Sequence, residues 1–169
     1  KKDNIVKRMA PLEAAIFSNN QLIKCNFDGC NLSYARFNNC DLSESSFINT
    51  NLEYSTLDHA NLKNANLKGA VLKSASLDNA CLEDVHLEQT DLRGVSVNHA
   101  NLNEIDFRSS LLSFKSIEGT KMRGTILEGK DFNQAVFTNV NLEQALLSRC
   151  NLEFTEFTNA NWNKTNFKF

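Results

Sequence analysis

The stretch from residue 60 to residue 80 reads ANLKNANLKGAVLKSASLDNA, and its leucines recur every five positions. Leu62, Leu67, Leu72 and Leu77 each follow an alanine by two residues. An α-helix repeats every ~3.6 residues and a β-strand every two. A period of five fits neither element, so the backbone in this stretch must bend regularly, once in every five residues.

The same period continues along almost the whole chain. From Leu12 to Phe167 every fifth residue is apolar, without an insertion, which makes 32 consecutive repeat centres. The residue two before each centre is mostly small, and the residue just before it is often Asn or Asp. All six glycines lie two residues after a centre, and Gly and Asn are the residues that tolerate φ > 0. Each pentad therefore predicts a large inward residue, a small inward residue and a turn.

Four such bends close a square coil of 20 residues. Stacked coils bury the large residues in columns and pair their backbones at ~4.8 Å per layer. In this register Phe17 lies below Phe37, and Phe27 lies below Phe47. Each coil is unstable alone and buries its core only against its neighbours, which is the logic of a solenoid.

The repeat units resemble those of a known family. Pentads such as ANLKN, ANLKG, CNLSY, CDLSE and TDLRG are similar to the motif of the pentapeptide-repeat proteins, over about residues 10–169. The resemblance implies an all-β solenoid: a right-handed, four-sided β-helix of about eight coils. Residues 12–169 form that β-helix in this interpretation, and residues 1–11 form an N-terminal cap or linker. The period excludes the left-handed hexapeptide β-helices.

Composition narrows the classes of function. The chain of 169 residues has 18 Lys and Arg against 20 Asp and Glu, a net charge of −2. Proteins that bind nucleic acid directly usually carry a basic excess, so we expect no such binding. No apolar run reaches the ~18 residues of a membrane span. The chain begins with Lys1 rather than Met, as expected of a fragment of a longer protein.

The five cysteines are an odd number and show no Cys-x-x-Cys metal spacing. They favour a reducing compartment: the cytoplasm, or a host cytosol if the protein is a secreted effector. Cys25, Cys30, Cys40 and Cys150 occupy the small inward column and Cys81 an outward position. We expect the first four to act as small hydrophobic residues.

No sequence pattern indicates a catalytic, metal-binding or phosphate-binding site. His59 and His99 share a face but lie two coils apart, about 10 Å, which is too far to bind one metal directly. The sequence contains no nucleophile constellation and no glycine-rich phosphate loop. A rod without loops also lacks the concave pocket of an enzyme. We therefore predict no catalytic residue, no cofactor, no metal and no enzymatic activity.

Exposed aromatic residues are the strongest candidates for binding. They share one turn position with a period of 20, which predicts that they project from one face: Tyr34, Tyr54, Phe114 and Phe154. Such a strip is typical of a protein-binding surface. The alternative, that one corner of the square favours aromatic stacking for local reasons, stays open.

Two lysines interrupt the small inward column. Lys115 and Lys130 must extend to solvent, find a carboxylate or mark a distorted coil, because an unpaired buried ammonium is costly. The glycine-rich run between them is the least regular part of the chain. It is either a functional bulge or a site that tolerates lysines at a corner.

The last coil has the most aromatic core layer: Phe157, Trp162 and Phe167. A solenoid end needs a cover, so we expect either a homodimer that meets end to end at this coil or a continuation of the chain.

These observations predict a non-enzymatic scaffold that binds another protein through its faces. One alternative is the recognition domain of a larger bacterial effector of the ubiquitin-ligase type. Another is a mimic of duplex DNA that protects DNA gyrase or topoisomerase. Family members of that last kind generally carry a more acidic surface, a larger loop and a dimerisation helix, none of which this sequence shows.

Overall fold

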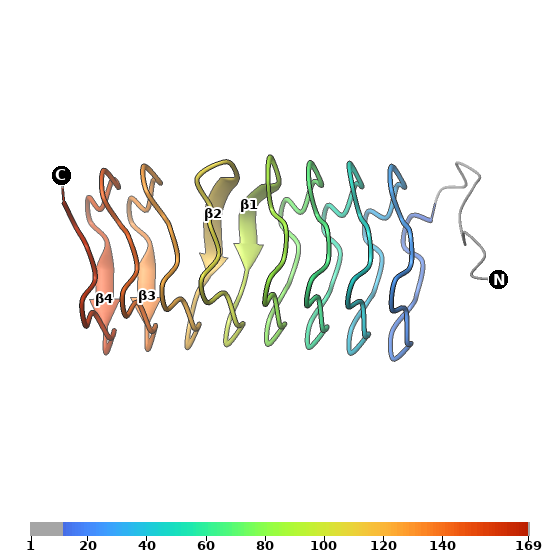
Figure 1. Cartoon of the computed structure of the whole chain (residues 1–169), viewed down its shortest axis with the longest axis horizontal. Coiled ribbons are helices and arrows are strands. Elements are labelled where there is room, and N and C mark those ends of the chain that lie inside the picture. The colour runs from blue at the N-terminus through green and yellow to red at the C-terminus, as the bar shows by residue number, and fades with distance from the viewer. Residues whose placement is uncertain (1–11, 169) are drawn as a thin grey trace.

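Parallel bridges join residues that lie twenty positions apart, from Ile16 with Arg36 to Leu146 with Asn166. They arise because one coil of four pentads returns the chain to the same side of the rod. The computed structural model describes residues 12–168 and has the shape of a straight stack of coils (Figure 1). The predicted cap or linker, residues 1–11, and Phe169 lie outside the described residues. No helix among the described residues is long and apolar enough to cross a membrane.

Short bridges join the coils on all four faces, and only four segments of the described chain are long enough to count as strands. β1 (Asp91–Ser96) pairs in parallel with β2 (Leu111–Ser116), and β3 (Val136–Thr138) pairs in parallel with β4 (Glu156–Thr158). The two pairs form separate sheets, so β2 is not joined to β3 (Figure 1).

The repeat centres fill the middle of the rod as predicted. Leu62, Leu67, Leu72 and Leu77 are completely buried. The predicted phenylalanine columns are confirmed: Phe17 stacks on Phe37 with ring centroids 4.7 Å apart, and Phe27 stacks on Phe47 at 4.9 Å. Both distances match the spacing of neighbouring β-strands, since each ring sits directly above its equivalent in the previous coil.

Each pentad ends in a tight turn. In a regular pentad the amide two before a centre donates to the carbonyl of the preceding centre, as Ala70 does to Leu67 at 2.9 Å. The second turn residue has φ near +60°, for example Gly69 at +68° and Tyr54 at +57°. A positive φ at this residue, and not at the one before it, defines a type II turn. The predicted turn position is thus confirmed, and it holds a left-handed residue even where that residue is not Gly.

Hydrogen bonds explain the other preferences of the repeat. An Asn or Asp before a centre accepts a bond from the amide two residues later, as Asn51 Oδ1 does from Glu53. Several buried threonines in the small inward column donate to the carbonyl of a centre 23 residues earlier: Thr50 Oγ1 to Phe27 O at 2.7 Å and Thr90 Oγ1 to Leu67 O at 2.9 Å are examples. These bonds fasten consecutive coils together and satisfy the buried hydroxyls.

Candidate functional site

The exposed aromatic pair lies on one corner of the rod, near its N-terminal end. Tyr34 and Tyr54 occupy the same turn position in consecutive coils, and their rings stack with centroids 5.0 Å apart and 12° between the planes. They are 52% and 46% exposed. The left-handed backbone at both residues aims the side chains outward, so the stack forms a rigid step on the surface.

A groove of about 340 Å³ runs beside this step. Its walls are Ala14, Ile16, Tyr34, Arg36, Tyr54 and Thr56. Ile16 is 72% exposed, and Arg36 forms no ion pair with any residue in the described part of the chain. Aromatic rings and a guanidinium are the groups that are enriched where proteins bind one another. We name these six residues the tyrosine corner.

Phe154 is exposed on the surface, whereas Phe114 packs against the core. Phe154 has φ of +56° and is 74% exposed, far along the rod from the tyrosines. Phe114 does not project: its φ is not positive, and it packs against the core. Its ring is parallel to that of Phe132, with centroids 5.9 Å apart, and edge-on to that of Phe137 at 6.5 Å. The expectation that all four aromatic residues line one face is therefore wrong for Phe114.

A shift of register explains this inward position. Between β1 and β2 the pairing runs regularly to Arg93 with Ser113, and then Val95 pairs with Phe114. Val95 belongs to the small inward column, so Phe114 takes the inward place that the repeat assigns to Lys115. Lys115 is exposed. The slip spares the ammonium a costly burial and places an aromatic ring in a column of small side chains.

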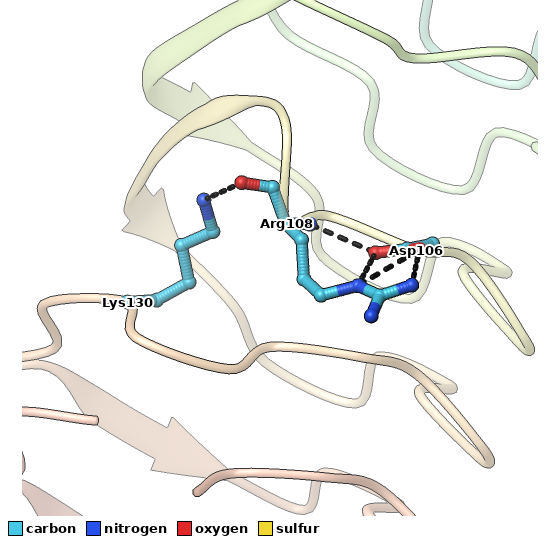
Figure 2. A network of polar contacts seen from close by, with 3 residues as sticks. All are labelled: Asp106, Arg108 and Lys130. Atoms are coloured by element: carbon cyan, nitrogen blue, oxygen red, sulfur yellow. Dashed lines mark hydrogen bonds and ion pairs between the residues drawn. The ribbon is translucent and has the colours of Figure 1, made fainter. Parts of the chain in front are cut away.

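Lys130 also occupies a position of the small inward column, but its ammonium group binds backbone carbonyls instead of moving outward. Its Nζ donates to the carbonyl oxygen of Ser110 in the preceding coil at 2.6 Å. It also donates to that of Arg108 at 3.2 Å (Figure 2). Partial burial lowers the pKa of Lys130, and the charge of nearby Asp106 opposes that shift. Arg108 in turn forms a fork with Asp106, 2.6 Å from Nη2 to Oδ2, which lowers the pKa of Asp106 (Figure 2).

The lysine contact accompanies a changed turn. Ser109 is, with Phe114, one of two turn positions between residues 12 and 168 whose φ is not positive. In most coils the amide at this position donates to the next coil, as Gly69 N does to Glu88 O. Gln89 N and Arg108 O do not form that bond in the described structure. A type I turn rotates the Arg108 carbonyl away from the ladder, and Lys130 binds it instead.

The C-terminal coil exposes part of its aromatic layer. Trp162 is 38% exposed, and its ring lies 4.4 Å from that of Phe157 and 5.6 Å from that of Phe167, measured between centroids. The three rings form one continuous apolar cluster. The end-to-end interface predicted there stays a prediction.

The histidines and cysteines of the described chain form no metal-binding cluster. No group of three or more His, Cys, Asp or Glu in residues 12–168 could hold a metal ion. Cys40 and Cys150 are buried, and burial raises the pKa of both thiols. Their Sγ atoms point at the carbonyls of Phe17 and Leu127, 23 residues earlier. They occupy the position of the threonine hydroxyls, in agreement with a structural role.

Comparison with known proteins supports the interpretation of the repeats. The model of the pentapeptide repeat region matches residues 9–77, and the model of eight pentapeptide repeats matches residues 71–108, 90–129 and 116–153. The chain belongs to the pentapeptide-repeat family. Its fold is the right-handed, four-sided β-helix of that family, as predicted.

Solved structures show the same fold at low sequence identity. HetL, a pentapeptide repeat protein involved in heterocyst differentiation regulation in the cyanobacterium Nostoc, is 19% identical, with a TM-score of 0.57 over 94% of this chain and 87% of that one. A trypsin-treated variant of QnrB1, a plasmid-mediated fluoroquinolone resistance protein, is 20% identical, with a TM-score of 0.58 over 92% of this chain and 80% of that one. No curated protein sequence matches the chain significantly.

Proposed function

We propose that this pentapeptide-repeat protein is a non-enzymatic scaffold that binds another protein through the tyrosine corner. The observation that carries the proposal is the stacked pair Tyr34 and Tyr54, about half exposed beside a groove that contains Arg36. Tyr and Arg are enriched at the energetic centres of interfaces. The stack is already ordered in the free protein, so binding requires little further loss of side-chain entropy.

The rest of the rod supports a binding role rather than catalysis. The inward side chains fill the core, and two surface grooves of the described rod, at the tyrosine corner and beside β2, contain neither a histidine nor a cysteine. A partner that binds such a surface recognises its shape and its regular spacing. Proteins of this architecture commonly present long faces to their partners.

The test is capture of partners from the source cell with three forms of the protein. Tyr34→Ser/Tyr54→Ser removes the step, and Lys24→Ser/Glu44→Ser is the matched control. The latter pair occupies the same turn position in consecutive coils at the diagonally opposite corner and forms an exposed ion pair of 2.9 Å. A partner that the wild type and the control retain, and the tyrosine variant loses, supports the proposal. Equal recovery by all three forms contradicts it.

Melting temperatures distinguish a lost surface from a damaged fold. The two tyrosines are exposed, so their replacement should change the melting temperature of the rod little. The two alternative functions have their own assays. A mimic of duplex DNA would alter gyrase supercoiling with and without a quinolone, and the complete reading frame would reveal a ubiquitin-ligase domain.

A further inference from the structure

The backbone ladder is open over two adjacent faces of the rod, between β2 and the following coil. A regular coil is joined to the next by amide-carbonyl bonds such as Leu72 N to Asp91 O at 2.8 Å, Ser74 N to Arg93 O at 2.9 Å and Leu77 N to Ser96 O at 2.8 Å. Two coils further along, the equivalent amides of Leu112, Phe114 and Ile117 make no such bonds in the described structure. The facing carbonyls belong to Asp131, Asn133 and Val136.

The bridges show the same gap. The rows that contain residues 111 and 116 run without interruption through the earlier coils, but neither residue forms a bridge with 131 or 136 in the described part of the rod. On the other two faces, bridges between Asn101 and Lys121 and between Asp106 and Ile126 hold the same two coils together. We name residues 111–117 with residues 131–136 the open seam. It is a slit between two coils that stay joined behind it.

Two residues keep the seam open. Phe114 places its ring against Phe132 in a position that small side chains occupy elsewhere, and so separates the two coils here. Lys130 binds the Ser110 carbonyl that the amide of Asp131 would otherwise reach, by analogy with Arg36 N and Ala15 O at 2.9 Å. The seam is therefore built by named side chains and is not a random break in the ladder.

The seam contains a groove of about 280 Å³ whose walls are partly apolar. Phe114 and Ile117 line one wall, and Ala135 and Val136 line the other. Val136 is 49% exposed, and Lys115 lies at the rim. Amides that make no bond to the next coil, opposite carbonyls that receive none from the preceding coil, are a template for another strand. Main-chain groups of an extended peptide satisfy both rows at once, whereas no side-chain ligand has that periodicity.

We propose that the open seam binds an extended peptide segment of a partner protein by β-strand addition. The carbonyls of the peptide accept hydrogen bonds from the amides of Leu112, Phe114 and Ile117. Its inward side chains are apolar, because they meet Phe114, Ile117 and Val136. Alternate side chains point outward and are free to vary. The proposal does not depend on the tyrosine corner, which lies several coils away.

A variant that closes the seam provides the test. Phe114→Gly/Lys115→Ala restores a left-handed turn residue, as at Gly94 with φ of +71°, and a small inward residue. We expect this variant to regain the regular ladder and to melt at a temperature equal to or above that of the wild type, so that lost binding cannot be attributed to unfolding.

The probe is a library of displayed 12-residue peptides, selected on the wild type after depletion on the closed variant. Selected peptides should bind the wild type at least tenfold more tightly than the closed variant and slow the amide exchange of Leu112, Phe114 and Ile117. Methylation of the peptide amides on alternate residues should abolish binding. Failure to select any peptide specific for the wild type overturns the proposal, as does a specific peptide that leaves those three amides unprotected.

Two controls distinguish the open seam from the tyrosine corner and from self-association. Tyr34→Ser/Tyr54→Ser should bind the selected peptides as tightly as the wild type does, so failure of either proposal leaves the other intact. Sedimentation identifies a second copy as the occupant: a wild type that dimerises and a closed variant that does not would overturn the proposal in favour of self-association.

Discussion

Phe114 lies parallel to Phe132, 3° apart in ring plane, in a column where other coils place alanine, serine, valine or threonine. This single contact explains three features of the rod: the register shift between β1 and β2, the outward position of Lys115 and the separation of β2 from β3. The free energy gained by burying an aromatic ring offsets the loss of several ladder bonds, each of which contributes about 1 kcal/mol net.

Amide exchange should reveal the seam in the free protein. The amides of Leu112, Phe114 and Ile117 should exchange faster than those of Leu72, Ser74 and Leu77, which donate to the next coil. The measurement is residue-resolved hydrogen exchange under native conditions. Equal protection in the two sets would show that the ladder is closed in solution.

Core and surface substitutions in the middle of the rod should differ sharply. Leu67 is completely buried, so Leu67→Ala should lower the free energy of unfolding by roughly 2–5 kcal/mol through lost burial and a residual cavity. The neighbouring Lys68 is an outward residue, and Lys68→Ala should change that free energy by less than about 0.5 kcal/mol. Chemical denaturation of both variants tests the inward and outward assignment, which similar losses would contradict.

The buried hydroxyl column should contribute measurably to stability. Thr90 Oγ1 donates to Leu67 O, and Thr90→Val keeps the shape while removing the donor. The Leu67 carbonyl retains its turn bond from Ala70, so the expected loss is about 0.5–1.5 kcal/mol. Thr158→Val, at an exposed position, is the control and should have almost no effect in the same denaturation experiment. A loss at Thr158 as large as that at Thr90 would refute the role of this column.

Lys130 should make stability depend on alkaline pH. Burial lowers its pKa in the folded state below the ordinary value of 10.5, so the unfolded chain binds more protons and stability attributable to this residue rises with pH up to that value. Lys130→Thr supplies a neutral donor of the kind that Thr120 provides to Val97 O at 2.7 Å. Melting temperatures measured from neutral pH to pH ~10.5 should therefore rise more steeply, or fall less steeply, for the wild type than for the variant. Parallel pH profiles would contradict the burial of the charged group.

The C-terminal aromatic layer remains a predicted interface between two copies. Trp162→Lys places a charge among Phe157, Trp162 and Phe167 and should prevent end-to-end association. Sedimentation at increasing protein concentration should show a dimer for the wild type and a monomer for the variant. A wild type that stays monomeric and soluble at high concentration would rule out this interface.

The regular part of the molecule could be predicted from the sequence because each of its features is local. An apolar residue every fifth position, a small residue two before it and a Gly or Asn two after it are sufficient to define the coil, its core columns and its turns. The positions of Tyr34 and Tyr54 on one corner followed from counting by twenty, since no insertion disturbs the register.

The exceptions depended on contacts between coils, which a repeat pattern does not contain. Lys115 and Lys130 both indicated an irregular stretch, but nothing local showed that the first would leave the core and the second would stay. The difference arises because Phe114 stands beside Lys115 and can replace it inside, whereas the neighbour of Lys130 is Gly129, which has no side chain to bury.

The sequence by itself determined the four-sided coil, since the pentad period leaves no other backbone geometry. Only the tertiary structure decided where the ladder opens, because that depends on whether an aromatic ring finds a stacking partner, Phe132, in the coil above.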